Sequence, residues 1–397
     1  MFVVTTAENM GDMALCQEWI GDLGRDTFQY AFVLCGNMAP YIDDGDVRFL
    51  FESDTDIRTT ILAAARSFGP EAIIFASNSF WTIPGQKGAQ FGTFPPELHL
   101  AGIPLLSFDP FELSFETTVR QTGARACFPA VPASVWALRY MSLSSTETNA
   151  RHFCSREVFS LARQTAGPEV LKKWGADPNR KTLVFAVSKN RHDFIERYYP
   201  EYFAHLSRLF STPPATEAQF LVVCADPIAA FAQLPNVVQI PQVPFGEFLS
   251  IVASSDLYLA DSLISCIVHA FHLAVPALLL AIGEKSRPLA TDGFMGANFF
   301  PCRVFPYGFV EICEVLEERF GVSGCYEEVE MLDAVDFAAA LQRKLFDSDG
   351  LSGLKQRCLQ WKSDRMKLPG PRETLDAVLA SPPLPGSGSH NVESIGE

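Results

Sequence analysis

A short polar segment near the start of the chain, Asn-Met-Gly-Asp at 9–12, contains a candidate general base. It lies between an apolar strand pattern at 2–6 and a helical pattern at 13–23. A carboxylate at such a position can take a proton from an attacking hydroxyl or amine, so Asp12 is the first candidate and Glu8 a weaker one. An alternative of equal weight is that Asp12 caps the helix by accepting hydrogen bonds from its first N–H groups.

A second polar segment, Ser-Lys-Asn-Arg-His-Asp at 188–193, follows another apolar strand pattern. Ser188, Lys189 and Arg191 place one hydroxyl and two cations where a diphosphate could bind. A solvated turn is an equally good interpretation of the same residues. We expect His192 to be a surface histidine without a catalytic role.

The stretch 256–280 predicts a strand, a turn, a helix and a second strand in succession. The strand 256–260 is apolar, and the helix 264–273 has apolar residues at helical spacing. Ser262 and Ser265 stand at the start of this helix, where N–H groups and the helix dipole favour phosphates. The alternative is an ordinary strand–helix–strand unit that binds no ligand.

Two aromatic side chains near this helix are also candidates. Phe245, in the loop 241–247, could stack on a nucleobase, and hydrophobic packing is an equally good interpretation. His269 lies on the apolar helix and is expected to be either a packed core residue or a ligand contact. His272, one turn further along, is expected to be partly exposed.

A long loop at 78–97 is rich in glycine, proline and aromatic residues and has no regular pattern. Long loops at the carboxyl edge of a parallel sheet are more often binding loops than connections. Phe80, Trp81 and Phe91 are therefore predicted to shape the pocket of an acceptor.

Apolar strand patterns alternate with helical patterns in both halves of the chain, which predicts parallel α/β sheets. The predicted strands are 2–6, 29–35, 47–52, 71–77, 103–109, 182–188, 219–225, 236–241 and 256–260, with a last one from Val275. The predicted helices are 13–23, 57–68, 156–175, 243–254, 264–273, 310–320, 333–347 and one from Leu351. A further helical stretch is predicted to follow a loop at 189–193 and to end near Phe210. The last helix presents one apolar face, formed by Leu351, Leu354, Cys358 and Trp361.

The composition argues against several classes of function. Of the 397 residues, 48% are hydrophobic and 19% charged, which indicates a compact globular protein. The net charge of −15 and the lack of a basic patch argue against a nucleic-acid partner. The apolar run at 273–282 is too short to cross a membrane. The chain also lacks a leader pattern at its start, so we expect a cytoplasmic protein.

The cysteines and histidines predict no metal site. The ten cysteines are scattered and form no C-x-x-C pair, which is typical of buried thiols in a reducing compartment. The seven histidines show no metal-binding spacing. The 9–12 segment is not a G-x-G-x-x-G motif, so no nicotinamide or flavin cofactor is expected either.

The order of elements at 241–280 resembles the donor half of GT-B glycosyltransferases, such as the N-acetylglucosaminyltransferases of peptidoglycan synthesis. Ala270 and the Val-Pro-Ala at 275–277 match the end of that pattern. Two departures stand out. Asp-Ser-Leu at 261–263 replaces the usual glycine-rich turn, and His269 stands where a ribose-binding glutamate is usual.

The 9–12 segment is similar to the N-x-G-D that opens protein-arginine rhamnosyltransferases and polysaccharide pyruvyltransferases, both GT-B-like. In the rhamnosyltransferases that aspartate is the base, so the resemblance implies this role for Asp12. It also implies that Lys189, Arg191 and Ser262 hold a donor diphosphate in place of a divalent metal, and that His269 contacts the ribose or a phosphate.

The expectation is thus an α/β protein with two Rossmann-like domains facing a cleft. The expected parts are an acceptor-binding domain at 1–165, a nucleotide-sugar-binding domain at 166–350, a helix crossing back to the first domain at 351–380 and a disordered tail at 381–397. Its expected activity is metal-independent, inverting sugar transfer from a nucleotide-diphosphate donor to an unidentified acceptor. The alternatives are a GT-B-like pyruvyltransferase, a nucleotide-sugar epimerase and a non-catalytic GT-B-like binding protein.

Overall fold

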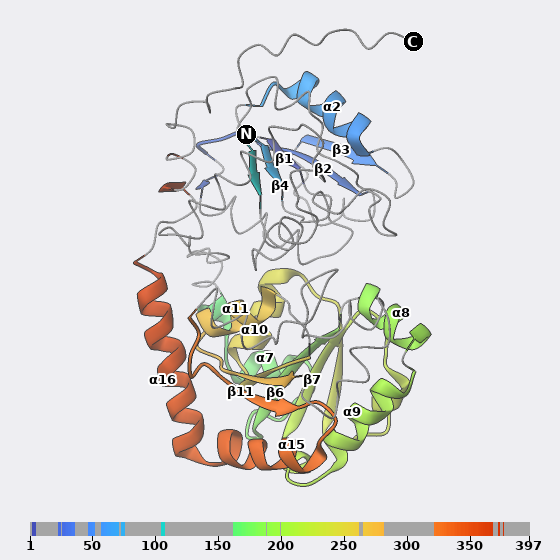
Figure 1. Ribbon diagram of the computed structural model, residues 1–397, viewed down its shortest axis with the longest axis vertical. Helices are drawn as coiled ribbons and strands as arrows, with labels where there is room; N and C mark the ends of the chain where they lie inside the picture. Colours follow the sequence, from blue (N-terminus) through green and yellow to red (C-terminus); the bar gives the residue numbers. More distant parts are fainter. Residues whose placement is uncertain are drawn as a thin grey trace, which may run out of the picture. The chain divides into compact units, whose positions relative to one another are not determined.

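The computed structural model divides the chain into two compact units, each described here by itself (Figure 1). The first unit comprises Met1–Glu8, Leu15–His152 and Leu368–Glu397, and the second comprises Asn9–Ala14 and Phe153–Lys367. The structure describes residues 2–4, 23–24, 26–35, 47–51, 57–70, 73–75, 105–107, 162–187, 189–198, 200–261, 265–281, 321–367, 372–373 and 376.

The first unit contains a parallel sheet with strand order β3-β2-β1-β4-β5. Its strands are β1 (Phe2–Val4), β2 (Ala31–Cys35), β3 (Val47–Phe51), β4 (Ile73–Phe75) and β5 (Leu105–Ser107). Helix α2 (Ile57–Phe68) connects β3 to β4. All five strands and α2 lie where the sequence predicts them, and the order is that of a Rossmann-type sheet.

The second unit contains a parallel sheet with strand order β11-β10-β9-β6-β7-β8. Its strands are β6 (Thr182–Val187), β7 (Gln219–Cys224), β8 (Val237–Pro241), β9 (Leu257–Ala260), β10 (Ala277–Ala281) and β11 (Tyr326–Glu330). The chain begins in the centre at β6, builds outward to β8, then returns to β9 and builds outward on the other side. The order therefore reverses between β6 and β9, which is the topological switch point of a doubly wound sheet.

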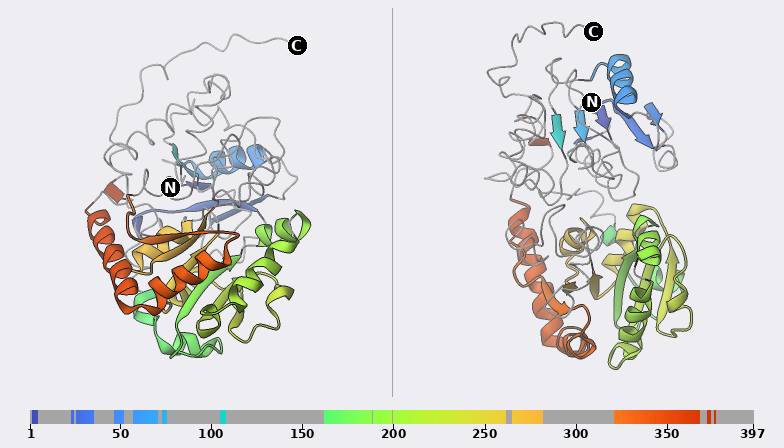
Figure 2. Two further views of the ribbon diagram at one scale, coloured as in Figure 1. Left: turned by 60° about the horizontal axis from the view of Figure 1, so that its bottom comes forward. Right: turned by 45° about the vertical axis from the view of Figure 1, so that its right-hand side comes forward.

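Burial on both faces explains why the central strands are continuous apolar runs. Every residue of β7 and β9 is buried. In a parallel sheet the crossover helices cover both faces, so strands need not alternate between apolar and polar residues. Helices α9 (Glu201–Ser211) and α16 (Ser348–Arg365) lie on opposite flanks of this sheet (Figure 2). Phe210 of α9 stacks on Phe220 of β7 with ring centroids 4.0 Å apart.

Strand β11 has no counterpart in the sequence-based prediction. Its sequence, Tyr-Glu-Glu-Val-Glu, contains three acidic residues, a type that is depleted in strands. Only Val329 is buried, because β11 is the edge strand beyond β10. This edge strand contributes one apolar residue, Val329, to the core, and a single apolar residue cannot produce the hydrophobic pattern from which strands are predicted.

The remaining helices of the second unit mostly follow the predicted apolar spacing. They are α7 (Pro168–Lys173), α8 (Lys189–Tyr198), α10 (Phe245–Ala253), α11 (Ser265–His272) and α15 (Ala334–Leu341), which continues as a π-helix over Gln342–Phe346. One prediction here is wrong: the polar residues 189–193 are the first turn of α8 and not a loop. Ion pairs along the helix, such as Lys189 with Asp193 at i,i+4, stabilise a turn that lacks an apolar pattern.

Helix α16 buries the face that the sequence predicts. Leu351, Leu354, Cys358 and Trp361 are all buried. The Trp361 ring packs against His272 of α11 with centroids 4.7 Å apart. Burial of His272 contradicts the expectation of partial exposure, because α16 covers this side of α11.

Beyond α16 the chain returns to the first unit. The guanidinium of Arg372 lies 4.9 Å from the centre of the Phe28 ring, a cation–π contact within that unit. The chain from Leu368 onward thus belongs to the first unit, whereas α16, the helix expected to cross, ends at Arg365 in the second unit. The exact domain boundaries given above stay predictions.

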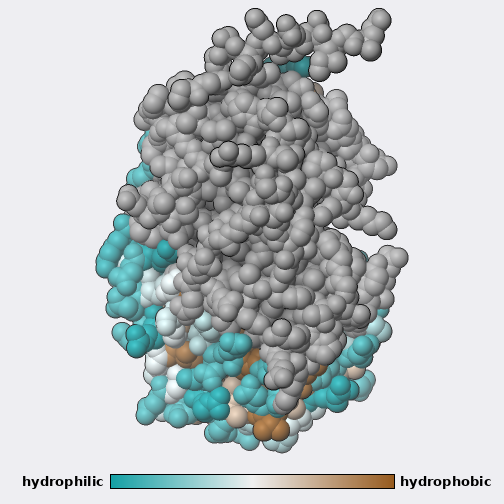
Figure 3. Space-filling view, viewed as in Figure 1, coloured by the Kyte–Doolittle hydropathy of each residue, from teal (hydrophilic) through white to brown (hydrophobic). Residues whose placement is uncertain are grey.

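On the face drawn in Figure 3, the described residues that can be seen are mainly hydrophilic, with some apolar side chains among them. Among the described residues, the large exposed hydrophobic ones are Leu50, Val335 and Leu359. Across the described ranges, none of the helices combines the length and the apolar character that a membrane span requires.

The buried histidine under α16 makes stability depend on pH. Burial lowers the pKa of His272 well below its ordinary value, and the charges of His269, Lys362, Arg365 and Arg163 lower it further. The unfolded chain protonates this imidazole near pH 6.5 while the folded protein keeps it neutral. The unfolded state therefore binds more protons below that pH, so stability falls as the solution is acidified.

We expect His272→Gln to flatten this dependence. In urea titrations between pH 5 and pH 7, the wild-type unfolding free energy should lose up to about 1.4 kcal/mol per pH unit below pH 6.5 through this one group. The variant should be less stable at pH 7 but have a shallower slope. Parallel slopes for the two proteins would show that His272 does not titrate in this way.

Candidate functional site

The carboxyl edge of the second sheet, at its switch point, is the place where a doubly wound fold binds ligands. Three polar residues follow three strands at this edge: Lys189 comes after β6, Asp226 after β7 and Asp261 after β9. Because these strands are parallel neighbours, segments far apart in the sequence end at the same edge.

Asp261, directly after β9, is a buried carboxylate with 1% of its surface exposed. It accepts a short hydrogen bond from the hydroxyl of Tyr202, which is buried on α9. A buried carboxylate is tolerated only when it is well hydrogen-bonded, so this pair attaches α9 to the end of β9. Asp261 is expected in a turn from its sequence, but no local pattern points to Tyr202 as its partner, because the two residues are 59 positions apart.

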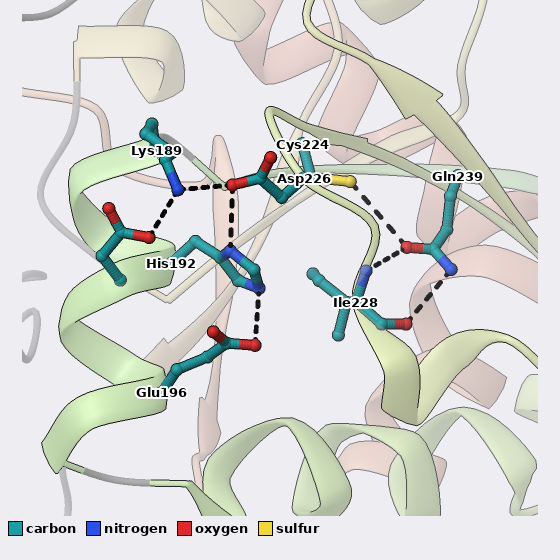
Figure 4. Close-up of polar contacts among 8 residues, drawn as sticks. Lys189, His192, Glu196, Cys224, Asp226, Ile228 and Gln239 are labelled. Carbon is teal, nitrogen blue, oxygen red and sulfur yellow. Dashed lines mark hydrogen bonds and ion pairs between the residues drawn. The ribbon is translucent and has the colours of Figure 1, made fainter.

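The ammonium of Lys189 is held by two carboxylates (Figure 4). Its Nζ donates to Asp193 Oδ1 at 2.7 Å and to Asp226 Oδ2 at 2.5 Å. Hydrogen bonds to Asp193 and then Asp226 raise the pKa of Lys189, and Lys189 in turn lowers the pKa of Asp226. A diphosphate that binds Lys189 must therefore compete with these two carboxylates.

His192 is buried, with 3% of its surface exposed, so the prediction of a surface histidine is wrong. Because α8 begins at Lys189, His192 falls on the helix face that packs against Phe203, with ring centroids 5.4 Å apart. Its Nδ1 lies 3.8 Å from Asp226 Oδ2 and its Nε2 lies 3.3 Å from Glu196 Oε1. Figure 4 shows the ring between these two carboxylates.

Gln239 of β8 holds the loop that carries Asp226. Its Oε1 accepts from the Ile228 N–H at 2.6 Å and its Nε2 donates to the Ile228 carbonyl at 3.2 Å. Cys224, at the end of β7, lies against the same amide (Figure 4). Burial, followed by the charge of Asp226, raises the pKa of the Cys224 thiol to about 11, so it stays protonated at neutral pH. Its thiol is therefore a poor nucleophile.

Two of the predicted donor-site residues lie side by side. The Phe245 ring, at the start of α10, meets the His269 ring of α11 edge-on with centroids 5.2 Å apart. Phe245 is half-buried, whereas His269 is buried. Burial of His269 agrees with the core interpretation, whereas Phe245 is only partly buried.

The other predicted site residues are only partly described. Arg191 lies in α8 and Ser265 is the first residue of α11, and nothing further is described for their side chains. The rest lie outside the described residues, and their roles stay predictions: Glu8, Asp12, Phe80, Trp81, Phe91, Ser188 and Ser262.

Comparison with solved structures identifies the architecture. The chain matches the glycosyltransferase SnogD from Streptomyces nogalater with a TM-score of 0.55 and 14% identity, over 96% of this chain and 98% of that one. It matches the spinosyn rhamnosyltransferase SpnG, in complex with spinosyn aglycone, with a TM-score of 0.57 and 10% identity over 95% and 99%. This is a GT-B fold. Glycosyltransferase VinC in complex with dTDP is similar at a TM-score of 0.55, with 14% identity over 96% and 98%.

The sequence itself matches neither a protein-family model nor a curated protein. The GT-B assignment therefore depends on structural similarity, with a Rossmann-type sheet in each unit, and not on shared motifs. Three features lie at the carboxyl end of the second sheet in this GT-B fold. They are Lys189 bound by carboxylates, the buried Asp261, and the Phe245–His269 ring pair.

We expect Tyr202→Phe to destabilise the second unit by about 1–3 kcal/mol, because Asp261 loses a buried hydrogen bond. The measurement is a double-mutant cycle with Asp261→Ala, which removes the acceptor, monitored by urea unfolding. Direct bonding predicts a coupling energy of at least about 0.5 kcal/mol between the two substitutions. Additive effects would show that the two side chains do not interact.

Proposed function

We propose that this protein transfers a sugar from a nucleotide-diphosphate donor to an acceptor hydroxyl or amine. The observation that carries the proposal is the GT-B fold, shared over 95–96% of the chain with several glycosyltransferases. Structures of these neighbours include complexes with thymidine diphosphate (dTDP), for VinC and SpnG, and with spinosyn aglycone, for SpnG. A donor and an acceptor of these chemical classes are therefore the natural candidates for this chain.

The second unit is proposed to bind the donor at its carboxyl edge. The exposed side of the Phe245 ring would contact the nucleobase, and His269 would help to orient that ring. The diphosphate would lie at the start of α11, close to Ser262 and Ser265, where helix N–H groups favour anions. Ser188, Lys189 and Arg191 would supply further donors from the segment after β6.

The transfer step is proposed to be a single displacement with inversion. Asp12 would take the proton of the acceptor as its oxygen or nitrogen attacks the anomeric carbon. The bond between that carbon and the diphosphate oxygen would break, and the electron pair would leave with the diphosphate. Charges and dipoles already in place would stabilise the leaving group, so this step would require no divalent metal. Glu8, Phe80, Trp81 and Phe91 would bind the acceptor.

The test is incubation of the protein with a panel of nucleotide-diphosphate sugars and acceptors, with free nucleotide as the readout. We expect Asp12→Asn to lower turnover by at least about a hundredfold, because a positioned general base contributes about 10²–10⁴. Asp26→Asn, at an exposed aspartate of the first unit, is the matched control and should retain wild-type turnover. Equal turnover in the two variants would exclude Asp12 as the base.

A non-catalytic sugar-nucleotide binding protein is the second candidate. Two features favour it. A buried carboxylate, Asp261, stands where GT-B transferases usually have a glycine-rich turn, and two carboxylates already bind the Lys189 ammonium that a diphosphate would use. Thermal stabilisation by a nucleotide without turnover would support this candidate, and release of nucleotide would exclude it. Stabilisation by none of the nucleotides would contradict both candidates. Epimerisation would be recognised in the same assay by the altered sugar, whereas pyruvyl transfer would require a pyruvyl donor to be added to the panel.

A further inference from the structure

We propose that His192, Asp193 and Asp226 form a binding site for a divalent transition-metal cation of the zinc type. The three residues come from α8 and from the loop after β7, and each offers one ligand atom. This inference does not depend on the proposed sugar transfer, in which no metal takes part.

The three ligand atoms are close enough to share one ion. They all lie within 4.8 Å of one another, and the His192 Nδ1 to Asp226 Oδ2 distance is 3.8 Å. Zn²⁺ binds such atoms at about 2.0–2.2 Å, which places tetrahedral ligands about 3.4 Å apart. Small side-chain rotations achieve this contraction, because the side chains of Asp193 and Asp226 are 55% and 47% exposed.

His192 is what distinguishes this cluster from an ordinary group of surface carboxylates. Its side chain is 4% exposed, and neither ring nitrogen forms a hydrogen bond with another described residue. Buried ring nitrogens nearly always have a partner, so an imidazole aimed at Asp226 without one calls for an explanation. Glu196 lies 3.3 Å from the other ring nitrogen, as the orienting carboxylate does behind a metal-bound histidine (Figure 4).

The cluster already binds a positive charge. The Lys189 ammonium sits between the carboxylates of Asp193 and Asp226, at 2.7 and 2.5 Å. Its side chain is 53% exposed, so it can swing into solvent when a metal ion takes its place. Metal binding would thereby release Lys189 from both carboxylates.

The chemistry of the ligands selects the ion. One imidazole nitrogen with two carboxylate oxygens suits Zn²⁺ and its first-row neighbours, whereas Mg²⁺ and Ca²⁺ prefer oxygen ligands alone. Three protein ligands at a partly exposed position leave a fourth site for water or a ligand oxygen.

The test is a calorimetric titration of the full-length protein with Zn²⁺, after treatment with a chelator to remove bound metal. We expect one ion per chain. Asp226→Asn should weaken binding by at least about tenfold through loss of a charged ligand. Lys189→Met should tighten it about tenfold, because the competing ammonium is removed. A merely acidic surface patch would respond to these two variants in the same directions, so the stoichiometry of one ion per chain and the control variant below distinguish the site from such a patch.

The matched control is Asp364→Asn. Asp364 is an exposed carboxylate paired with Lys367 at 2.7 Å, as Asp226 is paired with Lys189, but it is not one of the three proposed ligands. Its substitution should leave the Zn²⁺ affinity unchanged. Because His192 is buried, the Zn²⁺ affinity of His192→Gln is interpreted only if circular dichroism shows that the variant is folded. Asp193→Asn, at an exposed ligand, is a second test and should also weaken Zn²⁺ binding.

The absorption spectrum of bound Co²⁺ distinguishes this site from metal binding by any of the ten cysteines of the chain. Binding at His192, Asp193 and Asp226 predicts a cobalt spectrum without thiolate charge-transfer bands. The proposal is overturned if the wild type binds no stoichiometric Zn²⁺, if Asp226→Asn and Asp364→Asn bind alike, or if thiolate bands dominate the spectrum.

Discussion

Parallel pairing of β6 with both β7 and β9 is the constraint on which the second unit depends. Val184 pairs with Leu221 on one side and with Tyr258 on the other. The connections that leave this central strand must therefore build the sheet in two opposite directions. One consequence is a burial pattern in which central strands are apolar on both faces. Another is that the polar segments after β6, β7 and β9 end at one edge.

The charges gathered at that edge decide what it can bind. Asp193, Asp226 and Asp261 place three carboxylates at this edge, and the single positive charge of Lys189 is shared between the first two. Asp261 stays buried because Tyr202 donates to it. Among the residues described at this edge, the negative charge exceeds the positive charge, which favours binding of a cation over binding of a diphosphate. A donor nucleotide would gain positive surroundings from Lys189 once it leaves the carboxylates, from Arg191 of α8, or from helix N–H groups.

Much of the fold follows from local patterns. Helix α2 and the buried face of α16 are predicted from apolar spacing alone, and so are the five strands of the first sheet. The prediction fails where a segment has little apolar content. Strand β11 needs only Val329 for its core contact, and the first turn of α8 is stabilised by ion pairs. Neither segment has apolar residues at the regular spacing from which a strand or a helix is predicted.

The sequence by itself determined the α/β class, the two series of elements and the polar segments after the strands, because these depend on residue type and near neighbours. Only the tertiary structure decided which of those residues meet. Tyr202 reaches Asp261, and His192 turns inward toward Asp226, through contacts between distant segments. Burial is likewise a property of the packed molecule: His272 is covered by α16, which no pattern around the histidine reveals. Strand order and burial arise from long-range packing, and a local pattern carries no information about its distant partner.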